Sequence, residues 1–117
     1  MVVDDNAAIR KALHNVFEFS SDWSVCDAAN GREGIEKAKR LKPDLIVLDV
    51  SMPEMNGIDA AKVIHRIMPE VPLILCSLFT NERLAAEAQS AGVQAVVSKT
   101  QNMQALVSKA RELLRAS

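Results

Sequence analysis

Four short aliphatic runs of this chain each end in polar groups that can do chemistry. The clearest is the run 45–48, which ends in Asp49 and leads into a loop that begins at Val50. The other three runs end in acids, a hydroxyl and an amine: Asp4-Asp5, Ser77 and Lys99. Open parallel sheets bind their ligands outside the carboxyl ends of the strands. If these runs are strands of such a sheet, the polar groups meet at one edge and form a candidate site.

The elements that must position these groups alternate along the chain. Apolar residues at helical spacing follow Asp5, Asn30-Gly31 and Asn56-Gly57, and the clearest helical stripe lies within 103–114. Five β-α units imply a parallel sheet with right-handed crossovers and helices on both faces. The predicted fold class is α/β, with a five-stranded parallel sheet in the order 2-1-3-4-5 and five helices, flavodoxin-like and doubly wound.

Several residues signal where the helices begin and end. Asn30 with Glu33 three residues later resembles a capping box, and Asp5 could cap the first helix rather than serve a site. Leu84 is the only large apolar residue of the fourth helix, and a thinly anchored helix can shift. Three residues are expected to stop the second, third and fourth helices: Pro43, Pro69 and Gly92.

The composition is that of an ordinary globular protein. Of the 117 residues, 49% are hydrophobic and 25% charged, which fits one domain over 1–117. The net charge of -1 favours neither nucleic acid nor an anionic membrane as a partner. No apolar stretch approaches the roughly 20 residues of a membrane helix, and the N-terminus has no signal region. We therefore expect a cytoplasmic protein.

The two cysteines do not indicate a redox or metal site. Cys26 and Cys76 fall in predicted strands, with no CxxC spacing and no neighbouring histidine. Buried, reduced thiols are the expected state of both.

The polar strand ends, together with the pairs Met52-Pro53 and Asn56-Gly57, occur in the order of a known family. They resemble the receiver domain of two-component response regulators, over essentially the whole chain. The resemblance implies that Asp49 accepts a phosphoryl group from a sensor histidine kinase or a phosphotransfer protein. It also implies a Mg2+ site made by four residues, the last through its backbone carbonyl: Asp4, Asp5, Asp49 and Ser51.

Elementary electrostatics agrees with a cation at this position. Three carboxylates within about 5 Å repel by roughly 3 kcal/mol per pair at an effective dielectric near 20, so the pocket favours a divalent cation or a raised pKa. Oxygen ligands suit Mg2+, or Mn2+ in its place. The ammonium of Lys99 would neutralise phosphoryl oxygens, and the resemblance implies that Ser77 hydrogen-bonds the phosphoryl group and so rearranges the fourth helix.

Three residues depart from the family pattern near the output surface. Val96 stands where the family usually has Tyr or Phe, and Leu78 stands where a small residue is common and could narrow access to Asp49. Thr100 replaces a frequent proline, so we expect no cis peptide there. The resemblance implies an output surface on the fourth helix, fifth strand and fifth helix, for a homodimer or an effector, with Phe79 as its main hydrophobic contact.

Two other functions stay open from the sequence. A degenerate receiver could act as a constitutive protein-binding module, as Val96 and Leu78 suggest. A haloacid-dehalogenase-like phosphatase would also use an aspartyl nucleophile, but it usually needs a second acid two residues later, where Ser51 stands. The first strand has only three residues before the acids, so we expect a few native residues to be missing there, in either a stand-alone receiver or an excised domain.

Overall fold

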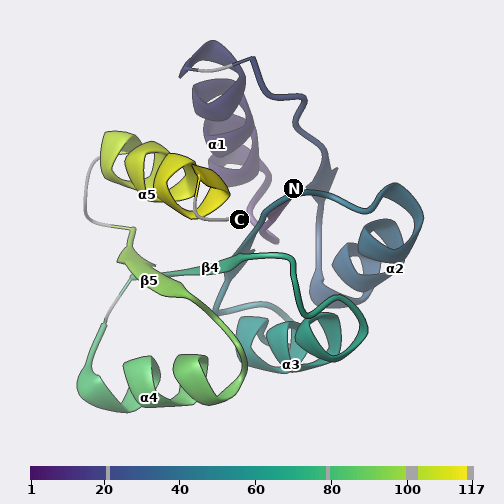
Figure 1. Cartoon of the computed structure of the whole chain (residues 1–117), viewed down its shortest axis with the longest axis vertical. Coiled ribbons are helices and arrows are strands. Elements are labelled where there is room, and N and C mark those ends of the chain that lie inside the picture. Colours follow the sequence, from purple (N-terminus) through teal and green to yellow (C-terminus); the bar gives the residue numbers. More distant parts are fainter. Residues whose placement is uncertain (21, 79, 100–102, 116–117) are drawn as a thin grey trace.

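The computed structural model describes residues 1–20, 22–78, 80–99 and 103–115 (Figure 1). Its centre is a five-stranded sheet of parallel pairs in the order β2-β1-β3-β4-β5, so the predicted fold class and strand order are confirmed. The register pairs Asp49 with Cys76 and Ser77 with Ser98. The strands are β1 (Val2–Val3), β2 (Asp27–Ala28), β3 (Ile46–Asp49), β4 (Leu73–Ser77) and β5 (Ala95–Ser98).

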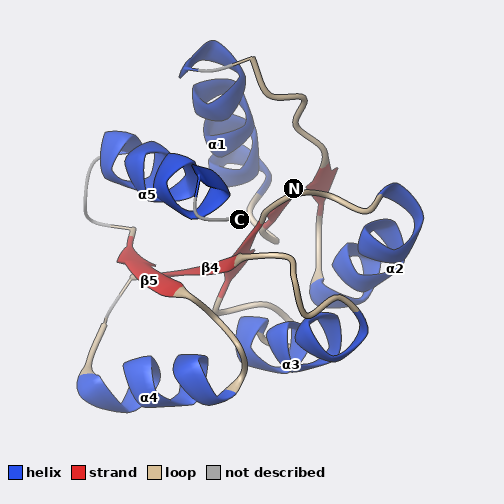
Figure 2. Ribbon diagram, viewed as in Figure 1, coloured by secondary structure: helices blue, strands red, loops and turns tan. Residues whose placement is uncertain are grey.

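Helices cover both faces of the sheet (Figure 2). Helices α1 (Ala7–Ser20) and α5 (Met103–Arg115) pack against one face. The other face carries α2 (Gly31–Leu41), α3 (Gly57–Ile67) and α4 (Glu82–Ser90). The crossovers therefore place every β-α loop at the same edge of the sheet, the edge where the strands end.

Alternation of side chains along the strands divides the core into two parts. Val47 and Ile74 pack with α1 and α5, whereas Leu48 and Leu75 pack with α2, α3 and α4. All four side chains are buried, which stabilises the fold by about 1.5 to 3 kcal/mol for each. Apolar residues on both faces are typical of parallel strands that helices cover on both sides.

Asparagine side chains cap the amino ends of helices α2, α3 and α4. Asn30, Asn56 and Asn81 each accept a hydrogen bond from the backbone N–H three residues later, at 2.8 to 2.9 Å. One half of the predicted capping box at Asn30 is present, because the Asn30 side chain accepts the N–H of Glu33. The other half differs, because the Glu33 carboxylate accepts the N–H of Ala29 rather than that of Asn30. The three helices end before Pro43, Pro69 and Gly92 as predicted, and Gly92 has a φ of 90°.

The fourth helix is thinly anchored, as the sequence predicted. Ala88 is the only buried residue of α4, and Leu84 is half-buried against the core. Because a small side chain buries little apolar area, α4 contributes less to stability than its neighbours do.

The cysteine prediction is right for one residue and wrong in part for the other. Cys76 lies in β4, and burial raises the pKa of its thiol to about 12. Cys26 precedes β2 instead of lying in it, and it is only half-buried. The strand is shorter than its apolar pattern suggests, because β1 offers it only Val2 and Val3 as partners. Both thiols are free.

The single tryptophan lies at the amino ends of the strands. Its ring centroid is 6.0 Å from that of Phe17, and the rings are tilted by 36°. Trp23 lines a surface hollow together with Met1, Leu45 and Pro72, the residues just before β1, β3 and β4. This hollow is therefore at the opposite edge of the sheet from Asp49.

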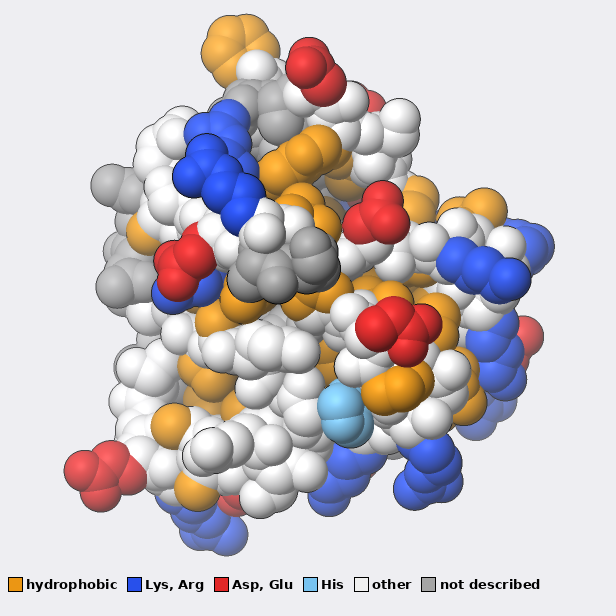
Figure 3. Space-filling view, viewed as in Figure 1, with side chains coloured by type: hydrophobic (Ala, Val, Ile, Leu, Met, Phe, Trp, Pro, Cys, Tyr) orange, Lys and Arg blue, Asp and Glu red, His pale blue; other side chains and the backbone are white. Residues whose placement is uncertain are grey.

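The surface carries charges of both signs. Basic and acidic side chains are interspersed with hydrophobic ones on the face shown in Figure 3, in line with the net charge of -1. None of the helices over the described residues is both long enough and apolar enough to cross a membrane.

Lys42 ends α2 in a conformation that disfavours a side chain, with φ of 49° and ψ of 62°. The left-handed region costs an ordinary residue roughly 1 to 2 kcal/mol. We expect Lys42→Gly to raise the free energy of unfolding by about 0.5 to 1 kcal/mol in urea denaturation. The gain is smaller than the relieved backbone strain, because glycine loses more conformational freedom on folding than lysine does. Lys39→Gly, inside the same helix, is the control and should lower it by about 1 kcal/mol. A loss in both variants would contradict the prediction.

Candidate functional site

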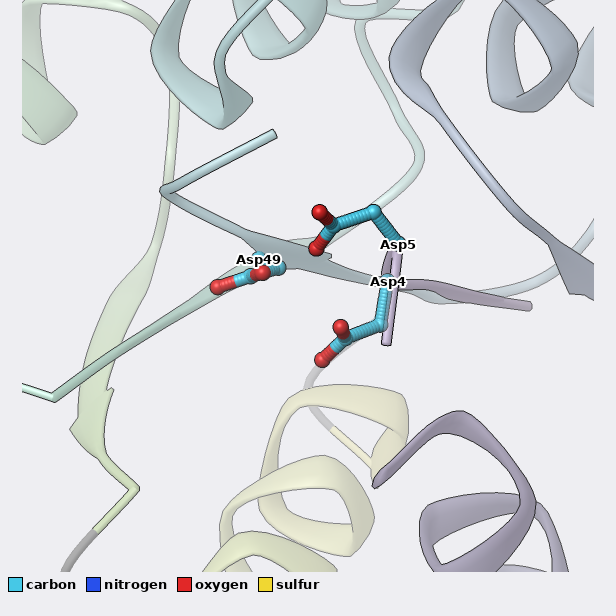
Figure 4. Close-up of side chains that lie close together, drawn as sticks. All are labelled: Asp4, Asp5 and Asp49. Carbon is cyan, nitrogen blue, oxygen red and sulfur yellow. The ribbon is translucent and has the colours of Figure 1, made fainter. Parts of the chain in front are cut away.

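Three carboxylates converge at the carboxyl edge of the sheet. Asp4 and Asp5 follow β1, Asp49 is the last residue of β3, and their side chains lie close together (Figure 4). One oxygen from each lies within 4.8 Å of the others. Asp4 and Asp49 are buried, whereas Asp5 is exposed. The site therefore opens toward solvent on the Asp5 side.

Lys99 supplies a positive charge to this cluster. Its Nζ lies 2.8 Å from Asp49 Oδ1 and 3.3 Å from Asp4 Oδ2. Burial alone would lower the pKa of Lys99, but the hydrogen bond to Asp49 and the charge of Asp4 outweigh it, so the pKa is raised. Lys99 is therefore an ammonium fixed between two carboxylates. Its backbone N–H also donates to the carbonyl of Ser77, at 2.7 Å.

Asp49 is harder to ionise than an ordinary aspartate. Its pKa is raised chiefly by burial, with a further contribution from the charge of Asp4, against the lowering effect of Lys99 and of the Ser51 backbone N–H. The cluster also sets three carboxylates against one ammonium. An oxygen-lined pocket with excess negative charge suits a hard divalent cation such as Mg2+.

Gly57 fixes the backbone behind Asp49. Its N–H donates to the carbonyl of Val50 at 2.9 Å. A Cβ at this position would overlap the carbonyl oxygen of Asp49 and come within 2.9 Å of Leu75. Gly57 does not have an unusual backbone conformation, because Gly92 is the only described glycine with positive φ. Close approach of two backbones is what requires a glycine here.

The loop after β1 is held by two residues of the first helical segment. Asn6 donates its N–H to Asp4 Oδ1 at 2.9 Å and accepts the N–H of Ile9 at 3.0 Å. The cap of α1 is therefore Asn6 and not Asp5, which leaves the Asp5 carboxylate to the site. Arg10 donates from Nη1 to the backbone carbonyl of Asp4 at 2.7 Å. The sequence analysis did not single out Arg10, because its contact depends on how α1 packs against β1.

Of the other predicted residues, four lie in described parts of the chain: Ser51, Ser77, Leu78 and Val96. Ser77 ends β4 and is buried, and Ser51 lies exposed in the loop after β3. Leu78 is 59% exposed, and Val96 is half-buried against the core beneath α2, α3 and α4. Phe79 and Thr100 lie outside the described residues.

Comparison with known proteins agrees with this arrangement. Residues 1–111 match the family model of the response regulator receiver domain. The chain belongs to this family. It is 40% identical to the chemotaxis protein CheY of Thermotoga maritima, over 85% of this chain and 82% of that protein. The response regulator domain of Thermotoga maritima CheB is 32% identical and superposes with a TM-score of 0.83, over 98% of this chain and 91% of that one.

Longer proteins also contain a similar segment. A protein-glutamate methylesterase/protein-glutamine glutaminase of Archaeoglobus fulgidus is 40% identical over 98% of this chain, which spans only 34% of that protein. A CheY-like receiver domain protein from Methanospirillum hungatei is 26% identical, with a TM-score of 0.92 over 98% of this chain and 91% of that one.

Membership of the receiver-domain family gives the general function of the chain. Receiver domains act in two-component signal transduction, in which they interact with histidine kinases or phosphotransfer proteins. Phosphorylation and Mg2+ binding at an acidic pocket are characteristic of the family, and this chain has an aspartate cluster at the matching edge. Receiver domains are signalling domains, although some relatives are methylesterases of which this chain resembles only the receiver portion.

Proposed function

We propose that the chain, as one receiver domain over 1–117, accepts a phosphoryl group on Asp49 from a sensor histidine kinase or a phosphotransfer protein. The observation that carries this proposal is the convergence of Asp4, Asp5 and Asp49 with the ammonium of Lys99. A buried carboxylate paired with an ammonium, at the open edge of a parallel sheet, can act as a nucleophile toward a phosphorylated donor.

The chemistry needs little from the protein beyond placement and neutralisation of charge. A carboxylate oxygen of Asp49 forms a bond to phosphorus while the bond between phosphorus and the donor nitrogen breaks. We assign Lys99, whose Nζ lies 2.8 Å from Asp49 Oδ1, to a phosphoryl oxygen, and this short distance supports the assignment. Ser77, at the end of the neighbouring strand, is the second group that we assign to the phosphoryl oxygens.

The residues present fit a Mg2+ ion, with Mn2+ as a substitute. We assign its ligands to the carboxylates of Asp4, Asp5 and Asp49 and to the backbone carbonyl of Ser51. All of these ligand atoms are oxygens, and the carboxylates carry more negative charge than Lys99 balances. When bound, the cation would supply positive charge to the phosphoryl oxygens.

The output is proposed to be protein contact, through a homodimer or an effector at the surface of α4, β5 and α5. The thin anchoring of α4 favours a helix that can shift when Ser77 is drawn toward a phosphoryl group.

Beyond its own phosphorylation and dephosphorylation we assign no catalytic activity to the chain, and no direct binding to nucleic acid or membrane. A cytoplasmic location stays a prediction.

A constitutive protein-binding module is the second candidate. Val96 gives this chain a small side chain, half-buried against the core, where the family usually has an aromatic one. Such a domain would bind Mg2+ at the same carboxylates and would not be phosphorylated.

Intact-mass spectrometry with acetyl phosphate and Mg2+ tests the phosphoacceptor. We expect one added phosphoryl group on the wild-type chain and none on Asp49→Ala, because the nucleophile is gone. Asp59→Ala removes an exposed acid from the first turn of α3 and is the matched control, which should be labelled like the wild type. Absence of the adduct from a wild-type protein that binds Mg2+ would move the assignment to the constitutive module.

A further inference from the structure

Arg10 links helix α1 to the peptide that joins the two adjacent aspartates of the site. Its side chain is half-buried, and Nη1 donates to the backbone carbonyl of Asp4 at 2.7 Å. This carbonyl belongs to the Asp4–Asp5 peptide, so the hydrogen bond restrains the plane of that peptide. The orientation of the peptide plane in turn determines the position and direction in which the Asp5 side chain leaves the backbone.

The two aspartates are restrained very unequally. Asp4 is buried, its N–H donates to the carbonyl of Ala28 at 3.1 Å, and its carboxylate accepts from Asn6 and Lys99. Asp5 is exposed, and over the described residues no hydrogen bond or ion pair holds its carboxylate. Its position relative to Asp49 therefore depends on the backbone, and Arg10 is the side chain that fixes this backbone from outside the site.

The charge of Arg10 also interacts with a carboxylate of α2. The pKa of Glu33 is lowered mainly by its hydrogen bond with Lys37, then by the N–H of Ala29, with a smaller contribution from the charge of Arg10. Glu33 is fixed by those two contacts, at 3.0 Å to Lys37 and 3.2 Å to Ala29. This attraction adds to the hydrogen bond by which Arg10 reaches Asp4, which is the contact that carries the inference.

We propose that Arg10 is a positioning residue for the cation site: it fixes the Asp4–Asp5 peptide so that the Asp5 carboxylate stays directed at Asp49. The inference rests on the Mg2+ site proposed above. Arg10 contacts the backbone of a proposed ligand and is not itself a ligand. Groups that orient metal ligands typically contribute about tenfold or more to metal affinity.

The sign of the effect separates positioning from simple electrostatics. A guanidinium near a cation site repels the cation, so removing its charge alone would strengthen Mg2+ binding. Loss of the hydrogen bond to the Asp4 carbonyl would instead weaken binding, because the Asp5 carboxylate would no longer be held in place. The two accounts predict opposite changes for the same substitution.

Titration of each protein with MgCl2 in a calorimeter tests the inference. We expect Arg10→Met to weaken Mg2+ binding by about tenfold, and Arg10→Lys, which keeps a donor and the charge, to bind better than Arg10→Met. Lys11→Met removes an exposed charge from the next residue of the same helix and should leave the affinity unchanged. Unfolding in urea with EDTA shows whether each variant is folded. If Arg10→Met does not fold, Arg10→Gln replaces it, because glutamine has a shorter side chain with a donor.

Equal or tighter Mg2+ binding by a folded Arg10→Met variant would overturn the inference while leaving the proposed function intact. A wild-type protein that binds no Mg2+ would overturn the proposed cation site and this inference together. The readout is cation affinity in the absence of any phosphodonor, so a failure of phosphorylation does not affect it.

Discussion

Replacing Gly57 with alanine is expected to destabilise the protein by about 2 to 3 kcal/mol, because the new methyl group overlaps the backbone of Asp49. The overlap is with a carbonyl oxygen of a central strand, and Leu75 closes the same space at 2.9 Å. A buried strand cannot move aside as a surface side chain can. Either α3 shifts away from β3 or the end of β3 moves, and the second response displaces the proposed phosphoacceptor.

Urea denaturation measures this loss, and Mg2+ affinity reports the displacement of Asp49. Gly31→Ala is the matched control, since Gly31 also begins a helix directly after an asparagine cap. The nearest atoms to a Cβ at Gly31 are the backbone oxygen of Met55 at 3.1 Å and its side-chain Cγ and Cβ at 3.2 and 3.3 Å, so a shift of a few tenths of an ångström in this loop makes room. We expect the control to lose less than about 1 kcal/mol. Equal losses in the two variants would show that close approach to Asp49 is not the cause.

Lys99→Met is expected to destabilise the protein without Mg2+ by about 3 kcal/mol, and to make Mg2+ binding at least about tenfold tighter. The substitution leaves the buried carboxylates of Asp4 and Asp49 without their countercharge. The same change removes a cation that competes with Mg2+ for these oxygens. Added Mg2+ should therefore restore more stability to this variant than to the wild type, in proportion to the logarithm of the ratio of affinities.

The loss should also depend on pH with a definite sign. The pKa of Asp49 is already raised by burial, and without Lys99 it should rise further. An acid whose pKa is higher in the folded state destabilises the fold above that pKa and ceases to do so as the pH falls through it. Urea denaturation in EDTA should therefore show a larger loss at pH 7 than at pH 5.

Lys109→Met is the control for Lys99→Met, because Lys109 pairs with Glu112 on the exposed side of α5. It should change stability by less than about 0.5 kcal/mol at either pH. If Mg2+ restored the same free energy to Lys99→Met as to the wild type, the carboxylates would not be the shared ligands of Lys99 and the cation.

The sequence was sufficient for the sheet and for the edge that holds the site. Periodicity and stop residues predicted the helices, and a carboxylate directly after the run 45–48 predicted where Asp49 would lie. The residue roles that the sequence did not reveal depend on contacts between helices and strands. Gly57 is explained by a strand that lies eight residues earlier in the chain, and Arg10 by the packing of α1 beside β1.

Local competition explains why the sequence left the cap of α1 undecided. Asp5 and Asn6 are both good helix caps, and nothing in their order decides between them. The structure decides because the N–H of Asn6 also donates to the Asp4 carboxylate, which turns the Asn6 side chain toward the helix. This choice leaves Asp5 free to face Asp49.

The position of Trp23 gives the molecule a built-in optical reporter for its stability. The indole packs against Phe17 at the amino ends of the strands, whereas the proposed ligand site is at the carboxyl ends. Its emission should therefore follow unfolding of the α1 side of the core and stay nearly constant when Mg2+ is added to folded protein. The same cuvette can thus measure how a ligand changes stability without the ligand quenching the signal directly.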